Sequence, residues 1–523
     1  MADSFDAVIV GAGLNGLAAA MHLAAKGWSV GLFERGAEPG GAVRSGEYTL
    51  PGFRHDWAAM NLSLFAGSAF FKAHGARLAA RGLAFAPAAD CFASSFPDGT
   101  WLGVSADLAA TRARIAAFSP DDAETWGQLV AAFPGEAQHL FGLLGSPMQK
   151  RALASFLWRL WRGKGSAGTL EFARFLTLSP RAWLTETFRS PHLHATLAAW
   201  GMHLDFAPDS AGGALFPYLE GMANQSFGMV LAQGGAGAVT EALVAEIRSL
   251  GGTVVCNAEV TSIRHASGRA DGIELADGRR VTARRAVIAN LAPSGLVRLT
   301  GGTGDAGFDR RLAAFDHAPG TMMIHLALDD LPDWKAGPEL RRFAYVHLAP
   351  SLDQMARTYQ QSKAGLLPDE PVIVVGQPTA IDPSRAPEGR HVLWLQVRMA
   401  PGRIAGDSRG EIAATDWAAA AEPFAERALD IVESHAPGLR SRILGRRVVS
   451  PAELEADNPN LVGGDQICGS HHLSQHFLFR PAPGHADGST PIRNLHLTGA
   501  AVWPGAGTGA GAGHLLAKRL AGA

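Results

Sequence analysis

The chain has 523 residues and a mass of 54.8 kDa, which is long for one ordinary domain and fits two or three. Hydrophobic residues make up 47% and charged residues 18%, so the chain is not disordered and can form a substantial core. Lys and Arg number 46 against 48 Asp and Glu, a formal charge of −2, so no global basic field indicates nucleic-acid binding.

The three cysteines, Cys91, Cys256 and Cys468, lie far apart in the sequence and do not predict a disulfide framework. No run of about 18 apolar residues occurs, and the N-terminus lacks the basic and cleavage-site segments of a signal peptide. We therefore expect no transmembrane helix and a reducing, cytoplasmic location.

The first 45 residues contain the clearest pattern of the chain. Residues 5–10 (FDAVIV) predict a buried parallel strand, residues 17–26 a helix, and residues 28–33 a second strand. A strand, a helix and a second strand within about 30 residues form one βαβ unit.

The rest of the chain alternates between mainly helical segments and segments with strand or βαβ patterns. Residues 76–227 show mainly helical patterns with many aromatic side chains, whereas the βαβ style resumes at Gly234. Residues 320–400 contain several strand-like runs, and the C-terminal block has a strand, a glycine-rich loop and a short helix over residues 494–520.

Gly11, Gly13 and Gly16 stand where the first strand turns into the helix, with Leu14 and Asn15 between them. In this pattern the first glycine permits the tight turn, the second lets a pyrophosphate approach the backbone, and the third packs helix against strand. The unpaired N–H groups at the helix N-terminus attract phosphate. The motif therefore predicts an adenine-dinucleotide site.

Glu34 ends the second strand, 18 residues beyond Gly16. A carboxylate there accepts hydrogen bonds from ribose hydroxyls and repels a 2′-phosphate, which favours FAD or NAD over NADP. A second match to the glycine pattern, at residues 302–307 (GTGDAG), follows no buried strand. We interpret that segment as a surface loop.

The segment after Glu34 distinguishes the two cofactors. Arg35, the pair Gly40–Gly41 and Arg44 follow it, and the arginine can form charge-assisted hydrogen bonds with phosphate or the flavin edge. This segment resembles the second signature of flavin amine oxidases and phytoene desaturases.

Three further stretches resemble the phytoene desaturase branch, namely residues 52–56 (GFRHD), 233–243 and 490–507. The similarity is greatest to phytoene desaturase-related proteins of the pyridine nucleotide-disulphide oxidoreductase domain subgroup. The resemblance implies FAD as cofactor, a C-terminal flavin motif that includes Gly499, Ala500, Gly507 and Gly509, and an adenine contact from the backbone of Val260.

Together these patterns predict an α/β fold in which a discontinuous Rossmann-like FAD-binding domain carries an inserted α+β substrate domain. We place the FAD-binding domain in residues 1–75, 228–300 and 455–523. The substrate domain takes a helical first insertion, residues 76–227, and a sheet-forming second insertion, residues 301–454.

The resemblance implies an FAD-dependent oxidoreductase that removes hydride from a hydrophobic, polyene- or isoprenoid-like substrate to form C=C. A flavin amine oxidase acting on C–N, a flavin isomerase, and a partner-binding flavoprotein stay open as alternatives. No second unit of strand, glycine motif and helix occurs that would bind NAD(P)H, and no CxxC occurs. We therefore expect oxygen or a quinone as electron acceptor. The sequence gives no oligomeric state.

The sequence assigns no catalytic residue and no metal site. Candidates of lower weight are the pair His55–Asp56, His203 with Asp205, the histidines at 471, 472 and 476, and Cys468 as a flavin tether. Residues 151–164 interleave Trp and Phe with Arg and Lys. A core-facing helix with a solvated basic edge and a helix lying on a membrane surface both fit that pattern.

Overall fold

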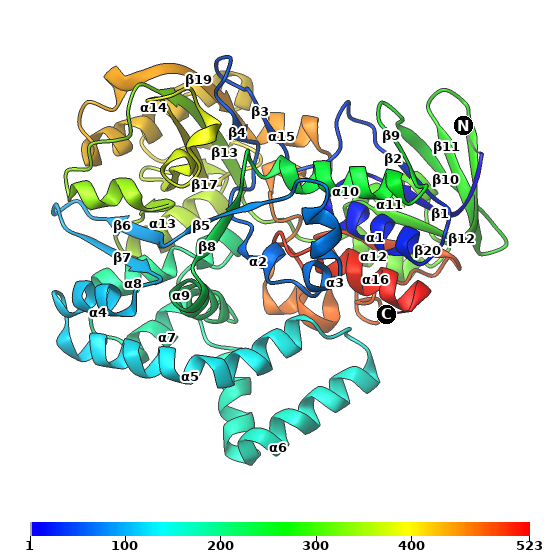
Figure 1. Ribbon diagram of the computed structural model, residues 1–523, viewed down its shortest axis with the longest axis horizontal. Coiled ribbons are helices and arrows are strands. Elements are labelled where there is room, and N and C mark those ends of the chain that lie inside the picture. Colours follow the sequence, from blue (N-terminus) through cyan, green and yellow to red (C-terminus); the bar gives the residue numbers. More distant parts are fainter. Residues whose placement is uncertain (1–2, 523) are drawn as a thin grey trace.

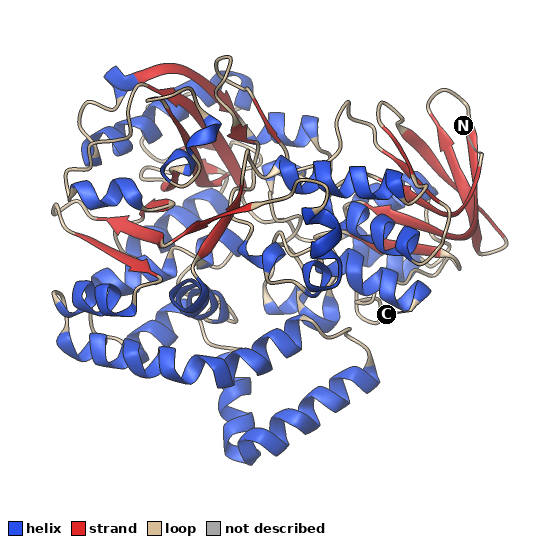
Figure 2. Ribbon diagram, viewed as in Figure 1, coloured by secondary structure: helices blue, strands red, loops and turns tan. Residues whose placement is uncertain are grey.

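The computed structural model describes residues 3–522 and divides into two lobes, each built on a seven-stranded sheet. Figure 1 shows both ends of the chain in the lobe on the right, while the left lobe contains the central part of the sequence. Figure 2 shows helices on the outside of both lobes and a long helical extension below them.

The first sheet has the order β10-β11-β12-β1-β2-β9, with β20 also paired to β12. Its central strands are parallel, as predicted from their continuous apolar sequences. Residues 7–10 of β1 are buried, as such a strand requires. The strands are β1 (Ser4–Val10), β2 (Val30–Phe33), β9 (Thr253–Val255), β10 (Val260–Ala266), β11 (Arg269–Leu275), β12 (Arg280–Asn290) and β20 (Leu495–Thr498).

Helices cover this sheet and bring separated parts of the chain together. Helix α1 contacts both α10 and α16, so the N-terminal unit packs against elements from the middle and the end of the chain. The helices of this lobe are α1 (Leu14–Ala25), α2 (Ser63–Ala66), α3 (Ala69–Ala79), α10 (Gly237–Ser249), α11 (Pro293–Thr300), α12 (Ala306–Ala313) and α16 (Gly511–Ala521), whereas α15 (Pro451–Asp457) packs against β13 of the second sheet.

The second sheet has the order β19-β13-β17-β16-β14-β6-β7. Two of its strands come from the first insertion, because β6 pairs with β14 in parallel, Tyr345 opposite Phe92. The strands are β6 (Asp90–Ser95), β7 (Trp101–Ser105), β13 (Gly320–Leu328), β14 (Tyr345–Leu348), β16 (Val372–Gly376), β17 (His391–Ala400) and β19 (Ile443–Val449).

Helices flank the second sheet, and α5 and α6 form the extension below the lobes (Figure 1). Helix α6 changes direction at Gly165, whose φ of 68° is not helical. The helices are α4 (Leu108–Ala116), α5 (Pro120–Leu144), α6 (Lys150–Phe175), α7 (Pro180–Thr187), α8 (Pro191–Ala198), α9 (Leu215–Phe227), α13 (Leu352–Lys363) and α14 (Trp417–His435).

Three short strand pairs lie outside the two large sheets. The short pairs are β3 (Ser45–Gly46) with β4 (His55–Asp56), β5 (Phe85–Ala88) with β8 (Met229–Ala232), and β15 (Leu366–Leu367) with β18 (Gly406–Asp407). Residues 302–307 form a loop in which Asp305 caps α12, so this second glycine pattern belongs to a helix start.

Candidate functional site

The glycine turn after β1 is closed too tightly for side chains. Gly11 has a φ of +90°, and a Cβ on Gly16 would lie 2.4 Å from the Gly11 carbonyl oxygen. Gly13 caps α1 in an extended conformation, and a Cβ there would lie 2.9 Å from the side-chain nitrogen of Asn290. The turn therefore exposes backbone to one side of the first sheet at the N-terminus of α1.

Glu34 lies at the end of β2, beside this turn. Its carboxylate accepts hydrogen bonds from the N–H groups of Ala12 and Gly36, both 2.8 Å long. The Ala258 N–H donates to the Glu34 carbonyl, which places the start of β10 and Val260 at the same edge of the sheet. Arg35 points elsewhere and donates to a backbone carbonyl in α15.

Gly40 and Gly41 form a second tight loop against the first, with φ values of 124° and 59°. The Gly40 N–H donates to the Ala12 carbonyl, so the two glycine loops are joined. Arg44 does not line the cavity described below. Its Nε donates to the Gly41 carbonyl, its guanidinium pairs with Asp457, and these contacts hold the loop.

The C-terminal block reaches the same place from the opposite direction. The Gly513 N–H in α16 donates to the Asn15 side chain at 3.1 Å, and a Cβ on Gly513 would lie 2.0 Å from the Asn15 carbonyl oxygen. Gly499 and Gly507 both have positive φ, whereas Gly509 lies against Leu64. Three distant stretches of the chain thus converge on one site.

A cavity of about 270 Å³ opens at this junction. Of the residues expected from the sequence, the following line it: Gly13, Leu14, Asn15, Gly40, Gly41, Gly499, Ala500 and Gly507. The others lie in the turns and strands around it and not on its wall: Gly11, Gly16, Glu34, Arg35, Arg44, Val260 and Gly509.

Sequence reasoning missed Asn290, which ends β12 beside the glycine turn. Its Nδ2 donates to the Gly11 carbonyl at 3.2 Å, and its own carbonyl accepts from Asn460. Both asparagines line the cavity. The available signal was position, because Asn290 follows a buried parallel strand and ligands bind at the carboxyl ends of such strands.

The far wall of the cavity comes from the second sheet. Alternate residues of β17 face it, namely Trp394, Gln396 and Arg398, because successive strand residues point to opposite faces. Tyr345 of β14 stacks with Trp394, with ring centroids 5.9 Å apart and planes inclined by 28°. The Tyr345 hydroxyl accepts from the Asn61 N–H at 3.1 Å.

Arg398 is a cation in the cavity wall that is 95% buried. Its guanidinium donates to the carbonyls of Met202 and His203 and to the hydroxyl of Thr321, while Nε is buried and has no partner. It forms no salt bridge within residues 3–522, and burial lowers its pKa to about 10. The wall therefore holds a positive charge.

His203 also lines the cavity, and its Nε2 lies 3.1 Å from Nε2 of His347. Burial lowers the pKa of His347 to about 3 and that of His203 well below its usual value, so both rings are neutral at pH 7. Asp205 does not line the cavity. Its carboxylate accepts from the Tyr359 hydroxyl and lies 3.6 Å from Nε2 of His472.

The remaining histidine candidates have structural contacts. His55 bonds to Thr49, and the neighbouring Asp56 accepts from Ser45 and from the N–H of Ala236, away from the cavity wall. His471 accepts from the Ala506 N–H at 2.9 Å and so holds the C-terminal glycine loop. The rings of His471 and His476 pack together with centroids 5.0 Å apart.

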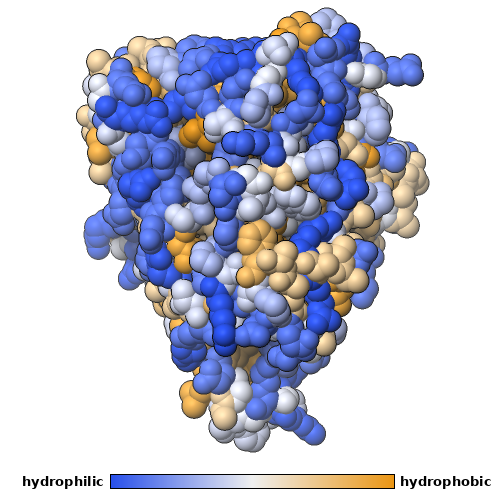
Figure 3. Space-filling model, turned by 90° about the vertical axis from the view of Figure 1, so that its left-hand side faces the viewer, coloured by the Kyte–Doolittle hydropathy of each residue, from blue (hydrophilic) through white to orange (hydrophobic). Residues whose placement is uncertain are grey.

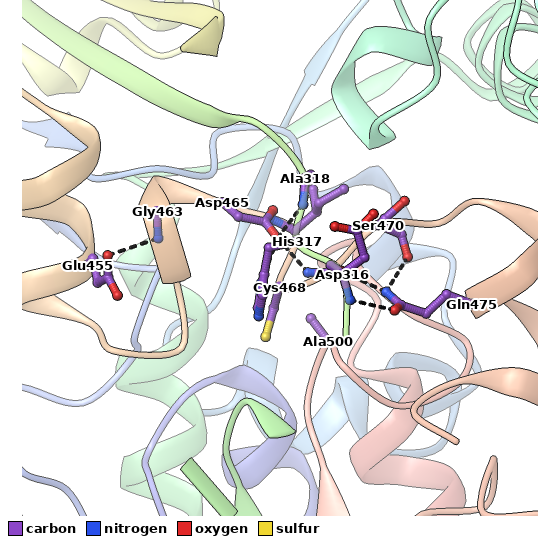
Figure 4. Close-up of polar contacts among 12 residues, drawn as sticks. Asp316, His317, Ala318, Glu455, Gly463, Asp465, Cys468, Ser470, Gln475 and Ala500 are labelled. Carbon is purple, nitrogen blue, oxygen red and sulfur yellow. Dashed lines mark hydrogen bonds and ion pairs between the residues drawn. The ribbon is translucent and has the colours of Figure 1, made fainter. Parts of the chain in front are cut away.

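The loop that carries Cys468 is fixed by a network of hydrogen bonds, shown in Figure 4. Asp465 accepts from the His317 ring and the Ala318 N–H, both at 3.1 Å, and Gln475 bridges Asp316 and the Ser470 backbone. Cys468 lines the cavity, and burial raises the pKa of its thiol to about 12. The protonated thiol is a poor nucleophile.

Comparison with known families extends this picture. The model of the NAD(P)-binding Rossmann-like domain matches residues 9–72, and that of the flavin-containing amine oxidoreductases matches residues 103–414, more than half of the chain. The chain belongs to the flavin-containing amine oxidoreductase family. It is an FAD-dependent oxidoreductase, because this family uses flavin and the glycine turn is built for a dinucleotide.

Relatives match over the full length. The chain is 28% identical to pyridine nucleotide-disulfide oxidoreductase domain-containing protein 2 of Rattus norvegicus, covering 99% of this chain and 94% of that one. It is 27% identical to a neurosporene-forming phytoene desaturase of Rhodobacter capsulatus, covering 98% and 93%. A putrescine oxidase triple mutant shares the fold, with a TM-score of 0.63, 15% identity and coverage of 99% and 98%.

The residues present fit FAD. A Cβ on Gly13 or Gly499 would meet Asn290 at 2.9 Å, so both glycine turns present backbone without side chains to the cavity that they line. The buried Nε2 of Gln466, in the cavity wall, has no partner in the protein. Gly13 and the N-terminus of α1 would hold the pyrophosphate, and the flavin ring would lie on the side of the cavity formed by the glycine loops, opposite the wall from β17.

Within residues 3–522, no helix combines the length and apolarity needed to cross a bilayer.

Proposed function

We propose that the protein dehydrogenates an apolar substrate, converting a C–C bond with adjacent C–H groups into C=C. Bound FAD would supply the oxidant, accepting a hydride from one carbon of the substrate. The chain contributes a cavity that orients the substrate. The full-length similarity to a phytoene desaturase supports this reaction class.

The observation that carries the proposal is the chemistry of the cavity wall. Its side chains are mainly apolar and aromatic, its one full charge is the cation Arg398, and no aspartate or glutamate occurs among the residues that line it. A protonated amine would be repelled by Arg398 and would find no counter-ion. The electrostatics therefore favour a neutral or anionic substrate over an amine.

Arg398 also favours one type of substrate end. The guanidinium donates to two carbonyls and a hydroxyl, and the carboxylates of Asp205 and Asp465 attract it without forming an ion pair with it. A carboxylate or another oxygen acceptor at the end of an otherwise apolar molecule would supply that missing partner. We propose that Arg398 binds such a group and so sets the position of the reacting carbons.

His203 is the one imidazole among the residues that line the cavity, and it is neutral at pH 7. Loss of a hydride from one carbon leaves the neighbouring carbon with a proton that a base must take. We propose that His203 accepts this proton, with His347 holding the ring through their 3.1 Å contact. Electrons would then pass to oxygen or a quinone.

The first test is anaerobic reduction of the bound flavin by candidate substrates. Polyenes such as phytoene and long-chain unsaturated carboxylic acids are expected to bleach the oxidised flavin, whereas putrescine and cyclohexylamine are expected to leave it unchanged. Bleaching by the amines alone would replace the proposal with amine oxidation. The absence of bleaching by every compound would favour an isomerase or a flavoprotein without redox turnover.

We also propose that α6 lies on a membrane surface. Phe156 and Leu160 face inward and are buried, so the core does not account for Trp158 and Trp161, which are 54% and 52% exposed. Arg162 stacks over Trp158, 5.2 Å from the ring centroid. Exposed indole rings beside basic residues suit the boundary between anionic headgroups and acyl chains, where an apolar substrate would be found.

A further inference from the structure

Three buried histidines that do not line the cavity meet in the FAD-binding lobe. His22 lies on α1, His74 on α3 and His514 on α16, and their exposed fractions are 3%, 8% and 5%. One ring nitrogen from each lies within 4.8 Å of the others. Figure 1 shows the three helices side by side, so each histidine comes from a different element.

The protonation state of His22 follows from its contacts. Its Nε2 lies 3.0 Å from the carbonyl oxygen of Gly522, and a carbonyl only accepts, so Nε2 carries the hydrogen. Burial lowers the pKa of His22, and the charges of Lys26 and Lys518 lower it further, so the ring is neutral at pH 7. Its Nδ1 then presents a lone pair toward His74, whose Nε2 is 3.1 Å away.

The other two rings are also available as ligands. Burial lowers the pKa of His74 and of His514 to about 4, so both are neutral at pH 7. The Nδ1 of His514 is buried and has no hydrogen-bond partner. Neutral imidazoles held in one place by three helices are suitable ligands for a borderline transition-metal ion.

We propose that His22, His74 and His514 bind one Zn²⁺ ion. Zinc–nitrogen bonds of about 2.0–2.1 Å place tetrahedral ligand atoms roughly 3.3 Å apart, close to the His22–His74 separation. The Gly522 carbonyl fixes the His22 ring in the manner of an outer-shell partner. With three protein ligands, a water molecule would complete the tetrahedron.

The ion would connect the two ends of the chain. His514 follows Gly513, whose N–H bonds to Asn15 at the start of α1, and α1 carries His22 two turns later. Zinc at this point would fix α16 against α1 and α3, behind the glycine loops of the flavin cavity. This role does not depend on the reaction proposed above.

The test is zinc content of the flavin-loaded protein. The wild type, dialysed first against a chelator and then against zinc, is expected to retain about one equivalent after desalting, measured by inductively coupled plasma mass spectrometry. His74→Gln and His514→Gln are each expected to weaken zinc binding by more than about 100-fold. Zinc is also expected to raise the melting temperature of the wild type alone.

His435→Gln is the matched control, because His435 is equally buried but lies on α14 in the other lobe. This control is expected to retain zinc as the wild type does. Flavin content and circular dichroism identify any variant that fails to fold, and X-ray absorption of the zinc-loaded wild type must show nitrogen and oxygen ligands without sulfur. A wild type that retains no zinc, or variants that retain as much as it does, would overturn the proposal.

Discussion

Single residues at this site fall into two groups that differ in how far their partners lie along the chain. Gly11, Gly13 and Gly16 belong to one turn between a strand and a helix, so their spacing alone predicts a dinucleotide site, although all three also lie against Asn290. Asn290 and Arg398 reach the cavity on β12 and β17, strands of two different sheets, so their proximity depends on how the two lobes meet. No spacing in the sequence predicts such residues, and sequence reasoning missed both.

Gly16→Ala tests the glycine turn. The added Cβ would lie 2.4 Å from the Gly11 carbonyl oxygen, so backbone must shift, at a cost of about 1–3 kcal/mol of folding stability, and bound FAD is expected to fall. The measurements are urea unfolding and flavin absorbance per chain. Gly142→Ala in α5, where a Cβ meets nothing within 4 Å, is the control and should retain FAD fully.

Arg398→Gln removes the charge from the cavity wall. In the wild type, hexanoate is expected to perturb the flavin absorbance at lower concentration than hexanamide, and the variant is expected to lose about tenfold or more of its hexanoate affinity. Arg403→Gln, at an exposed position just beyond β17, should behave as the wild type does. A variant that still prefers hexanoate would contradict the role given to Arg398.

His203→Gln tests proton removal. The amide can still hydrogen-bond to His347 but cannot act as a base, so anaerobic flavin reduction by substrate should slow by about 100-fold. Stopped-flow absorbance measures this rate directly, and the FAD content of the variant should stay at the wild-type level. An unchanged reduction rate would show that water or another group takes the proton.

At the scale of elements, sequence patterns predict strands and helices well where the apolar residues fall on one clearly defined face. Residues 280–290 form one long strand, β12, whose first part pairs with β11 and whose last part pairs with β20. The helix at residues 151–162 was expected, but its outward face was ambiguous. Figure 3 shows the side of the molecule that lies on the left in Figure 1, where the surface is mostly hydrophilic and interrupted by smaller hydrophobic groups.

The double variant Trp158→Ser/Trp161→Ser tests the outward face of α6. Each indole would transfer its exposed apolar surface into the lipid interface, so the pair should contribute about 3 kcal/mol, roughly 100-fold in vesicle affinity. Co-sedimentation with phosphatidylcholine–phosphatidylglycerol vesicles measures it. Phe227→Ser, at a 70% exposed position on α9, is the control. Equal sedimentation of all three proteins would exclude a membrane role for α6.

At the scale of the whole molecule, the lobes are joined by a buried ion pair. Arg385, from the second insertion, pairs with Asp56 and donates to the Ala232 carbonyl at 2.9 Å, and both charged side chains are almost fully buried. The sequence does not predict this junction, because a pair separated by more than 300 residues leaves no local pattern.

Arg385→Met leaves Asp56 buried without its cation. The expected loss of unfolding free energy is about 3–5 kcal/mol, measured by urea denaturation. Arg54→Met breaks the exposed pair with Glu241 and should change the same quantity by no more than about 1 kcal/mol. Similar losses in both variants would mean that the buried pair does not hold the lobes together.

The contact between Gly513 and Asn15 has a consequence for biosynthesis. The ribosome makes the N-terminal phosphate-binding turn first, but the cradle for the ring is finished only when α16 emerges, almost 500 residues later. A nascent chain would therefore have half a binding site throughout most of translation. Cofactor loading must then be among the last events in maturation, and a ribosome stalled before β20 would hold a polypeptide that added flavin cannot rescue.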